Sequence, residues 1–197
     1  MFLEQVDSKN NSFVKYLRGS LIIIFIHFLG QIPLSLYLIS GNINIENLED
    51  QSQILSLIPP NLGLILILIP FLVTLPVLWF VVTKLHNQNI TSLITSRTKI
   101  DYGKIIFAFF LWGGISATLV ISDYLINPDD YVWNFKLIPF LTLLVIAVLM
   151  IPIQTTVEEL IFRGYLMHGF GRLTKNRWGP LLITSVIFGM LHLWNPE

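Results

Sequence analysis

The sequence contains two adjacent carboxylates and an arginine whose side-chain types and spacing suit a functional site, namely Glu158, Glu159 and Arg163. Glu159 and Arg163 are four residues apart, so on a helix they share one face and can form an ion pair. Glu158 is turned by about 100° from Glu159, and no such partner lies close to it in sequence. An ionisable side chain at membrane depth is costly and therefore a functional candidate. The alternative is that Glu158 only caps a helix or pairs with another one.

A histidine and an aromatic ring, His192 and Phe188, follow in the next apolar stretch and share a helical face. Glu158 lies fourteen residues before Arg172, and His192 lies fifteen after Arg177, so a hairpin around that basic turn brings them to similar depth. Alone, His192 would be an ordinary helix-interface histidine. A carboxylate that takes a proton from water, together with an imidazole and a metal or hydrogen-bond donors that stabilise the oxyanion, can carry out hydrolysis.

The composition indicates where these residues lie. The 197 residues are 54% hydrophobic and 12% charged, whereas soluble domains carry about 25% charged residues. We therefore expect an all-α, polytopic transmembrane helix bundle. The sequence has no cysteine, which excludes disulfides, thiolate zinc ligands and cysteine nucleophiles. We expect membrane lipids as partners and no nucleic acid, although the net charge of zero does not itself decide the second point.

Apolar stretches predict about five spans, at residues 21–40, 62–82, 105–126, from 137 past 163, and 180–194. About 20 residues at 1.5 Å each cross the hydrocarbon. Pro152 is the expected kink in the long fourth span. We treat residues 1–136 as an amino-terminal region of three spans and residues 137–197 as a partial catalytic region of two.

The basic residues predict the orientation. Eleven of the twelve Lys and Arg residues lie in segments 1–18, 84–104 and 163–179, which five spans place on one side; Lys136 falls on the other. Basic loops mark the cytoplasmic side. The sequence therefore predicts a cytoplasmic amino terminus and a cytoplasmic 163–179 turn.

Glu158-Glu159-Leu160-Ile161-Phe162-Arg163-Gly164 and Phe188-x-x-x-His192 resemble the first two motifs of the CPBP family. That family includes type II CAAX prenyl endopeptidases, Abi proteins and bacteriocin-immunity proteins. The resemblance covers about residues 151–197 and implies an intramembrane metal-dependent endopeptidase in a bacterial plasma membrane.

The resemblance also assigns roles to single residues. It implies that Glu158 activates the attacking water and that His192 helps bind a divalent metal, zinc, or the oxyanion. Glu158 and His192 would be metal ligands, Glu159 and Arg163 would support the site, and Phe188 would wall it. The substrate would be a membrane-embedded or lipidated peptide.

One part of the family pattern is missing. The third motif, His-x-x-x-Asn, is absent, and the sequence stops five residues after His192. A catalytic zinc site needs about three protein ligands. We therefore expect this chain to be a piece of a longer protein that is truncated before the third motif.

Two other functions remain open. A rhomboid-like serine protease could be read from Gly114-Ile115-Ser116-Ala117, although helix packing explains such small residues. A non-catalytic immunity or partner-binding protein could use the same scaffold.

Overall fold

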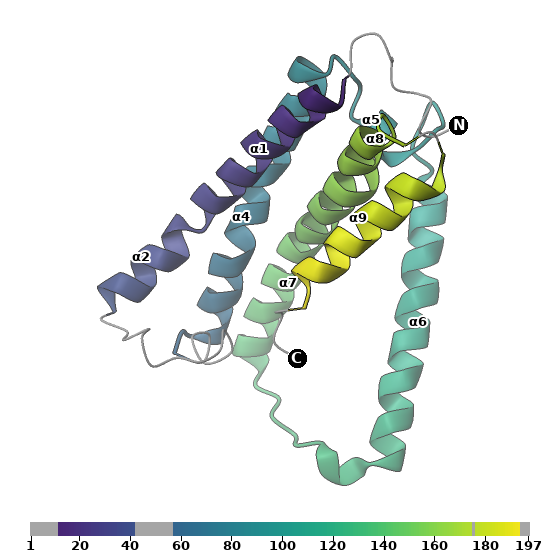
Figure 1. Cartoon of the computed structure of the whole chain (residues 1–197). Coiled ribbons are helices and arrows are strands. Elements are labelled where there is room, and N and C mark those ends of the chain that lie inside the picture. The colour runs from purple at the N-terminus through teal and green to yellow at the C-terminus, as the bar shows by residue number, and fades with distance from the viewer. Residues whose placement is uncertain (1–11, 42–56, 175, 194–197) are drawn as a thin grey trace.

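The computed structural model describes residues 12–41, 57–174 and 176–193. Every regular element in these ranges is helical, which confirms the all-α prediction (Figure 1). The longer helices are α1 (Phe13–Gly30), α2 (Ile32–Ser40), α4 (Pro60–Phe80), α6 (Tyr102–Ile126), α7 (Leu137–Glu159) and α9 (Trp178–Leu191). The short elements are η3 (Val81–Leu85), α5 (Thr91–Ile94), η4 (Pro128–Asp130), η5 (Leu160–Leu166) and α8 (Met167–Phe170).

Within the three described ranges, four helical runs are long and apolar enough to cross a membrane: Phe13–Ser40, Pro60–Leu85, Tyr102–Ile126 and Leu137–Phe170. The chain is therefore a polytopic integral membrane protein. In place of the expected fifth span, α9 is an apolar helix of 14 residues. At 1.5 Å per residue it reaches about 21 Å, which is shorter than about 30 Å of hydrocarbon.

The first span differs from its predicted bounds of 21–40. Its helix begins at Phe13, and a single residue, Gln31, separates α1 from α2. Pro33 is the second residue of α2. Proline has no N–H to donate and crowds the carbonyl of the preceding turn, so the regular helix is interrupted just before it. Pro152 lies inside α7, and the kink expected there stays a prediction.

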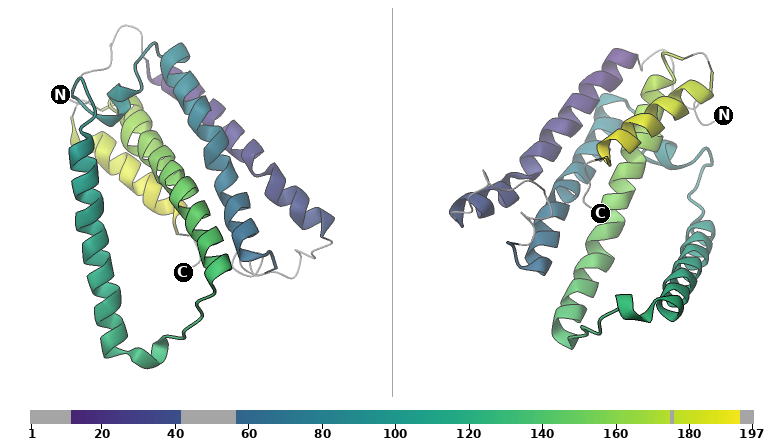
Figure 2. Two further views of the ribbon diagram at one scale, coloured as in Figure 1. Left: turned by 180° about the vertical axis from the view of Figure 1, so that it is seen from behind. Right: turned by 60° about the horizontal axis from the view of Figure 1, so that its bottom comes forward.

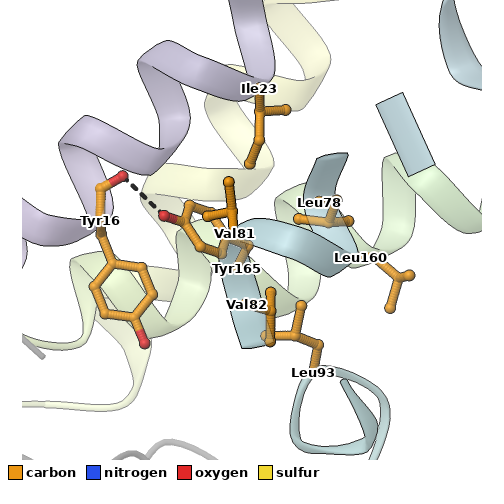
Figure 3. Close-up of a cluster of buried hydrophobic side chains, with 8 residues drawn as sticks. All are labelled: Tyr16, Ile23, Leu78, Val81, Val82, Leu93, Leu160 and Tyr165. Carbon is orange, nitrogen blue, oxygen red and sulfur yellow. Dashed lines mark hydrogen bonds between the residues drawn. The ribbon is translucent and has the colours of Figure 1, made fainter. Parts of the chain in front are cut away.

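The packing centres on helix α4. Helix α4 packs against both α1 and α7, and α9 packs against η5 and α8. The main buried cluster is built from residues of α1, α4, η3, α5 and η5 (Figure 3) and consists of Tyr16, Ile23, Leu78, Val81, Val82, Leu93, Leu160 and Tyr165. Contacts between α4 and α7 cross the predicted boundary at residue 136, and the two-region division stays a prediction.

Helix α6 stands apart from the other spans in both views of Figure 2. None of its residues is buried, and it packs against the short turn helix η4. Its apolar side chains are suited to contact lipid along the whole helix.

Candidate active site

A pocket of about 170 Å³ lies between the end of α7, the segment η5 and helix α9. Its walls combine the two motifs that the sequence analysis singled out, and the side chains that line it are Glu158, Glu159, Phe162, Arg163, Thr184, Ser185, Phe188 and Gly189. The structure thus brings the carboxylate pair and the arginine to the same cavity as Phe188.

Glu158 has a neighbour that the sequence analysis missed. Its side chain is partly buried, and Gln154 Nε2 donates a hydrogen bond to Glu158 Oε1 at 3.3 Å. Gln154 lies one turn earlier on α7. An amide four residues before a carboxylate is a recognisable helical pair, so the sequence did hold this signal.

The predicted pair of Glu159 and Arg163 forms at the mouth of the pocket. Arg163 Nε lies 3.3 Å from Glu159 Oε2, and the two side chains are 71% and 51% exposed. The pair bridges α7 and η5, because Glu159 is the last residue of α7 and Arg163 lies in η5.

His192 lies at the carboxyl end of α9 and is exposed. It does not line the pocket, but its ring packs on Phe188 at a centroid distance of 4.3 Å. Phe188 in turn meets Phe162 edge-on at 5.0 Å. His192 is thus one aromatic ring away from the pocket that holds Glu158.

The hydrogen bond of His192 fixes its tautomer. Nδ1 lies 2.8 Å from the Phe188 carbonyl oxygen, and a carbonyl can only accept, so Nδ1 carries the proton. Because Nδ1 is the donor in this bond, Nε2 is the ring nitrogen left to accept a proton or bind a metal.

Two hydroxyls in the pocket were also missed. Thr184 and Ser185 line it from α9; Thr184 Oγ1 donates to the Pro180 carbonyl at 2.9 Å. Their positions four residues before Phe188 and Gly189 place them on the same helical face, so the spacing could have indicated them.

Gly164, which follows Arg163, lets another element approach η5. A Cβ at Gly164 would lie 2.9 Å from both the Cβ and the carbonyl oxygen of Leu93. Leu93 belongs to α5, which packs on η5. The Arg-Gly step in this motif therefore has a packing reason.

The metal prediction can be compared with the donor groups in the three described ranges. There, no three His, Asp or Glu side chains are grouped so that they could hold a metal ion. A catalytic zinc ion takes about three protein ligands. Glu158 and His192, together with the rest of the described residues, therefore do not by themselves fit a zinc site.

Residues 138–197 match the model of the family described as "Type II CAAX prenyl endopeptidase Rce1-like". This part of the chain belongs to that family. The match begins in α7 and covers η5, α8 and α9, so the whole pocket lies within the Rce1-like region. The predicted family membership is confirmed.

A second comparison extends over the complete chain. "Uncharacterized protein YyaK" of Bacillus subtilis (strain 168) is 32% identical over all 197 residues, which correspond to 66% of that protein. The chain thus spans just under two thirds of this relative's length. No solved structure matches. Ser116, the residue of the rhomboid-like alternative, lies on α6 outside the Rce1-like match.

Proposed function

We propose that this chain is part of an intramembrane endopeptidase that cleaves a membrane-embedded or lipidated peptide. The observation that carries the proposal is the pocket that Glu158 and Arg163 line together with Phe188 of α9. A carboxylate, a cation and an aromatic wall in a partly enclosed cavity suit hydrolysis of a peptide bond beside an apolar group. The Rce1-like match of residues 138–197 supports the same reaction class. We place the protein in a bacterial plasma membrane, in line with its Bacillus relative.

In the proposed reaction Glu158 is the general base. It accepts a proton from a water molecule, and the hydroxide oxygen attacks the carbonyl carbon of the scissile peptide. Gln154 orients the carboxylate through its hydrogen bond. The proton then passes to the leaving amine nitrogen as the C–N bond breaks. Arg163 lines the same pocket, and its guanidinium can stabilise negative charge on the carbonyl oxygen.

We propose that His192 accepts a proton or binds a metal through Nε2, since its Nδ1 proton is held by the Phe188 carbonyl. A zinc ion, if the protein takes one, would polarise the carbonyl or the water and would need ligands beyond the described residues. Removal of divalent ions with phenanthroline, followed by addition of zinc, tests this role. Cleavage that survives the chelator rejects the zinc proposal.

The main experiment measures cleavage of lipidated and transmembrane peptides by the complete gene product in proteoliposomes. We expect Glu158→Gln and His192→Ala to abolish cleavage. Asp129→Asn serves as the control because this carboxylate lies in η4, far in sequence from the pocket motifs. Reading the gene beyond the codon for Glu197 shows whether an apolar segment with His-x-x-x-Asn follows.

Failure of the wild-type protein to cleave any of these peptides would reject the protease. Binding of a peptide or protein partner without cleavage would then support the immunity or partner-binding alternative. Cleavage that is unchanged in Glu158→Gln would reject Glu158 as the base.

A further inference from the structure

Three buried rings form a cluster that shares the segment η5 with the pocket wall, at the cytoplasmic end predicted from the basic loops. Tyr16, His86 and Tyr165 are 2%, 2% and 1% exposed. Their ring centroids lie 4.2 Å apart for Tyr16 and His86, 5.0 Å for Tyr16 and Tyr165, and 5.3 Å for His86 and Tyr165. They come from α1, from the residue after η3, and from η5. We call these residues the ring cluster.

The hydrogen bonds of the ring cluster have defined donors and acceptors. The Tyr165 hydroxyl donates its proton to the Tyr16 carbonyl oxygen at 3.1 Å (Figure 3). The same hydroxyl lies 2.9 Å from His86 Nε2. Because its single proton already goes to the carbonyl, the hydroxyl must accept from His86, so His86 Nε2 carries a proton.

The elements joined by this hydroxyl share an unusual backbone. Both η3 and η5 are π-helical; His86 follows η3 directly, and Tyr165 lies within η5. Such segments are well under 1% of residues in proteins and occur often at functional sites. The π-helical segment η5 starts immediately after Glu159 and contains Arg163, so its register sets where the arginine lies relative to the carboxylates.

Close packing surrounds the hydroxyl. A Cβ added at Gly19 of α1 would clash with the Tyr165 hydroxyl and lie 2.7 Å from Val81 Cγ1. A Cβ at Gly169 of α8 would lie 3.0 Å from Tyr16 Cβ. Gly19 therefore lets α1 approach the Tyr165 hydroxyl closely, and Gly169 lets α8 approach Tyr16.

We infer that Tyr165 is a positioning residue whose hydroxyl, held between the Tyr16 carbonyl and His86, keeps η5 in its π-helical register. We call this pair of hydrogen bonds the latch. When the latch is lost, η5 can return to α-helical hydrogen bonding. This change shifts the hydrogen-bond register by one residue and rotates the following side chains by about 100°. Arg163 and Phe162 would then leave their places in the pocket wall. The activity readout of this inference rests on the proposed function.

The first test compares cleavage kinetics. Tyr165→Phe and His86→Leu are expected to lower kcat about tenfold with a KM change below about twofold, because catalytic groups are misplaced while the substrate still binds. His86→Gln keeps an N–H donor and is expected to restore kcat to within about threefold of wild type, by the donor geometry of the amide. Tyr102→Phe, with a tyrosine 67% exposed, is the control.

The second test does not depend on activity. The sequence has no cysteine, so Val14→Cys and Leu182→Cys, at positions that are 53% and 62% exposed, can carry spin labels on α1 and α9. Helix α9 packs on η5 and reports its rotation. We expect one narrow distance distribution in the background protein and in His86→Gln, and a broadened or shifted one in Tyr165→Phe and His86→Leu.

The two tests distinguish failure of the latch from failure of the proposed protease function. An unchanged distance distribution in both Tyr165→Phe and His86→Leu overturns the latch, whatever their activity. A changed distribution in a protein that cleaves nothing supports the latch and rejects the protease. If Tyr165→Phe does not fold, the comparison of His86→Leu with His86→Gln replaces it. Equal distance distributions in these two variants overturn the latch.

Discussion

Glu158 shows what a carboxylate in an apolar helix requires. A charge removed from water needs hydrogen-bond partners, and Gln154 supplies one from the preceding turn. The carboxylate remains accessible from the pocket, where it can meet a water molecule. Partial enclosure together with one orienting donor suits a general base.

Replacement of the donor provides a prediction. We expect Gln154→Leu to lower kcat/KM about tenfold, since a hydrogen bond to a charged group contributes about 1.5–3 kcal/mol and this one is long. Gln31→Leu, at the exposed junction of α1 and α2, is the matched control. Peptide cleavage in proteoliposomes measures both, and an equal loss in the two variants would contradict the orienting role.

His86 is a buried imidazole just beyond the Pro60–Leu85 span. Burial lowers its pKa from 6.5 to about 4, and the positive charges of Lys15 and His168 act in the same direction. Between these pKa values the unfolded chain binds the proton more readily than the folded chain, so folding stability falls as the pH drops from about 6.5 to about 4.

This linkage predicts a difference between wild type and His86→Gln, which keeps a donor but cannot titrate. On going from pH 7 to pH 5 in detergent micelles, the melting temperature of wild type should fall by several degrees more than that of His86→Gln. Equal decreases in the two proteins would mean that His86 does not set the pH dependence of stability.

At the scale of elements, small residues decide which helices can approach each other. Gly19 faces the Tyr165 hydroxyl and Val81, whereas Gly113 on α6 has nothing within 4 Å of a Cβ placed there. The two glycines lie in membrane-spanning helices and differ in their surroundings. They therefore form a matched pair for substitution.

We expect Gly19→Ala to reduce the free energy of unfolding by about 1–3 kcal/mol, because the added methyl group overpacks the buried cluster. Gly113→Ala should change it by no more than about 1 kcal/mol. Thermal unfolding in detergent tests both variants. A Gly113→Ala variant as unstable as Gly19→Ala would show that α6 has a tight neighbour at that position.

At the scale of the whole molecule, the basic loops predict how the chain is placed in the membrane. The loop at residues 95–101 should lie in the cytoplasm and the one at 127–136 outside. Single-cysteine variants Ser96→Cys and Asn134→Cys test this in intact cells with an impermeant maleimide. We expect Asn134→Cys to react at once and Ser96→Cys to react only after permeabilisation; the reverse pattern would invert the topology.

Some of this architecture could be predicted from sequence because its cause is local. Run length and composition predicted the long apolar helices, and the four-residue spacings predicted that the Glu159–Arg163 pair forms. Other features depend on distant contacts. Helix α1 begins at Phe13, in a segment with Lys15 and Arg18, because the nearby Tyr16 is buried against Tyr165. We infer that the π-helical register of η5 also depends on distant partners, Tyr16 and His86, which hydrogen-bond to Tyr165. No periodicity in residues 160–166 indicates this register.

The hydrogen bond between Tyr165 and Tyr16 joins residues that are 149 positions apart. This separation in sequence affects how the protein folds during its synthesis. At about 5–20 residues per second, the ribosome needs about 7–30 s to add the tyrosine that completes this contact. Throughout that interval, the first helix is already synthesised while the glycine-lined surface that receives Tyr165 is still open. We therefore expect the nascent chain to depend on the insertion machinery or a chaperone to shield this surface during biogenesis.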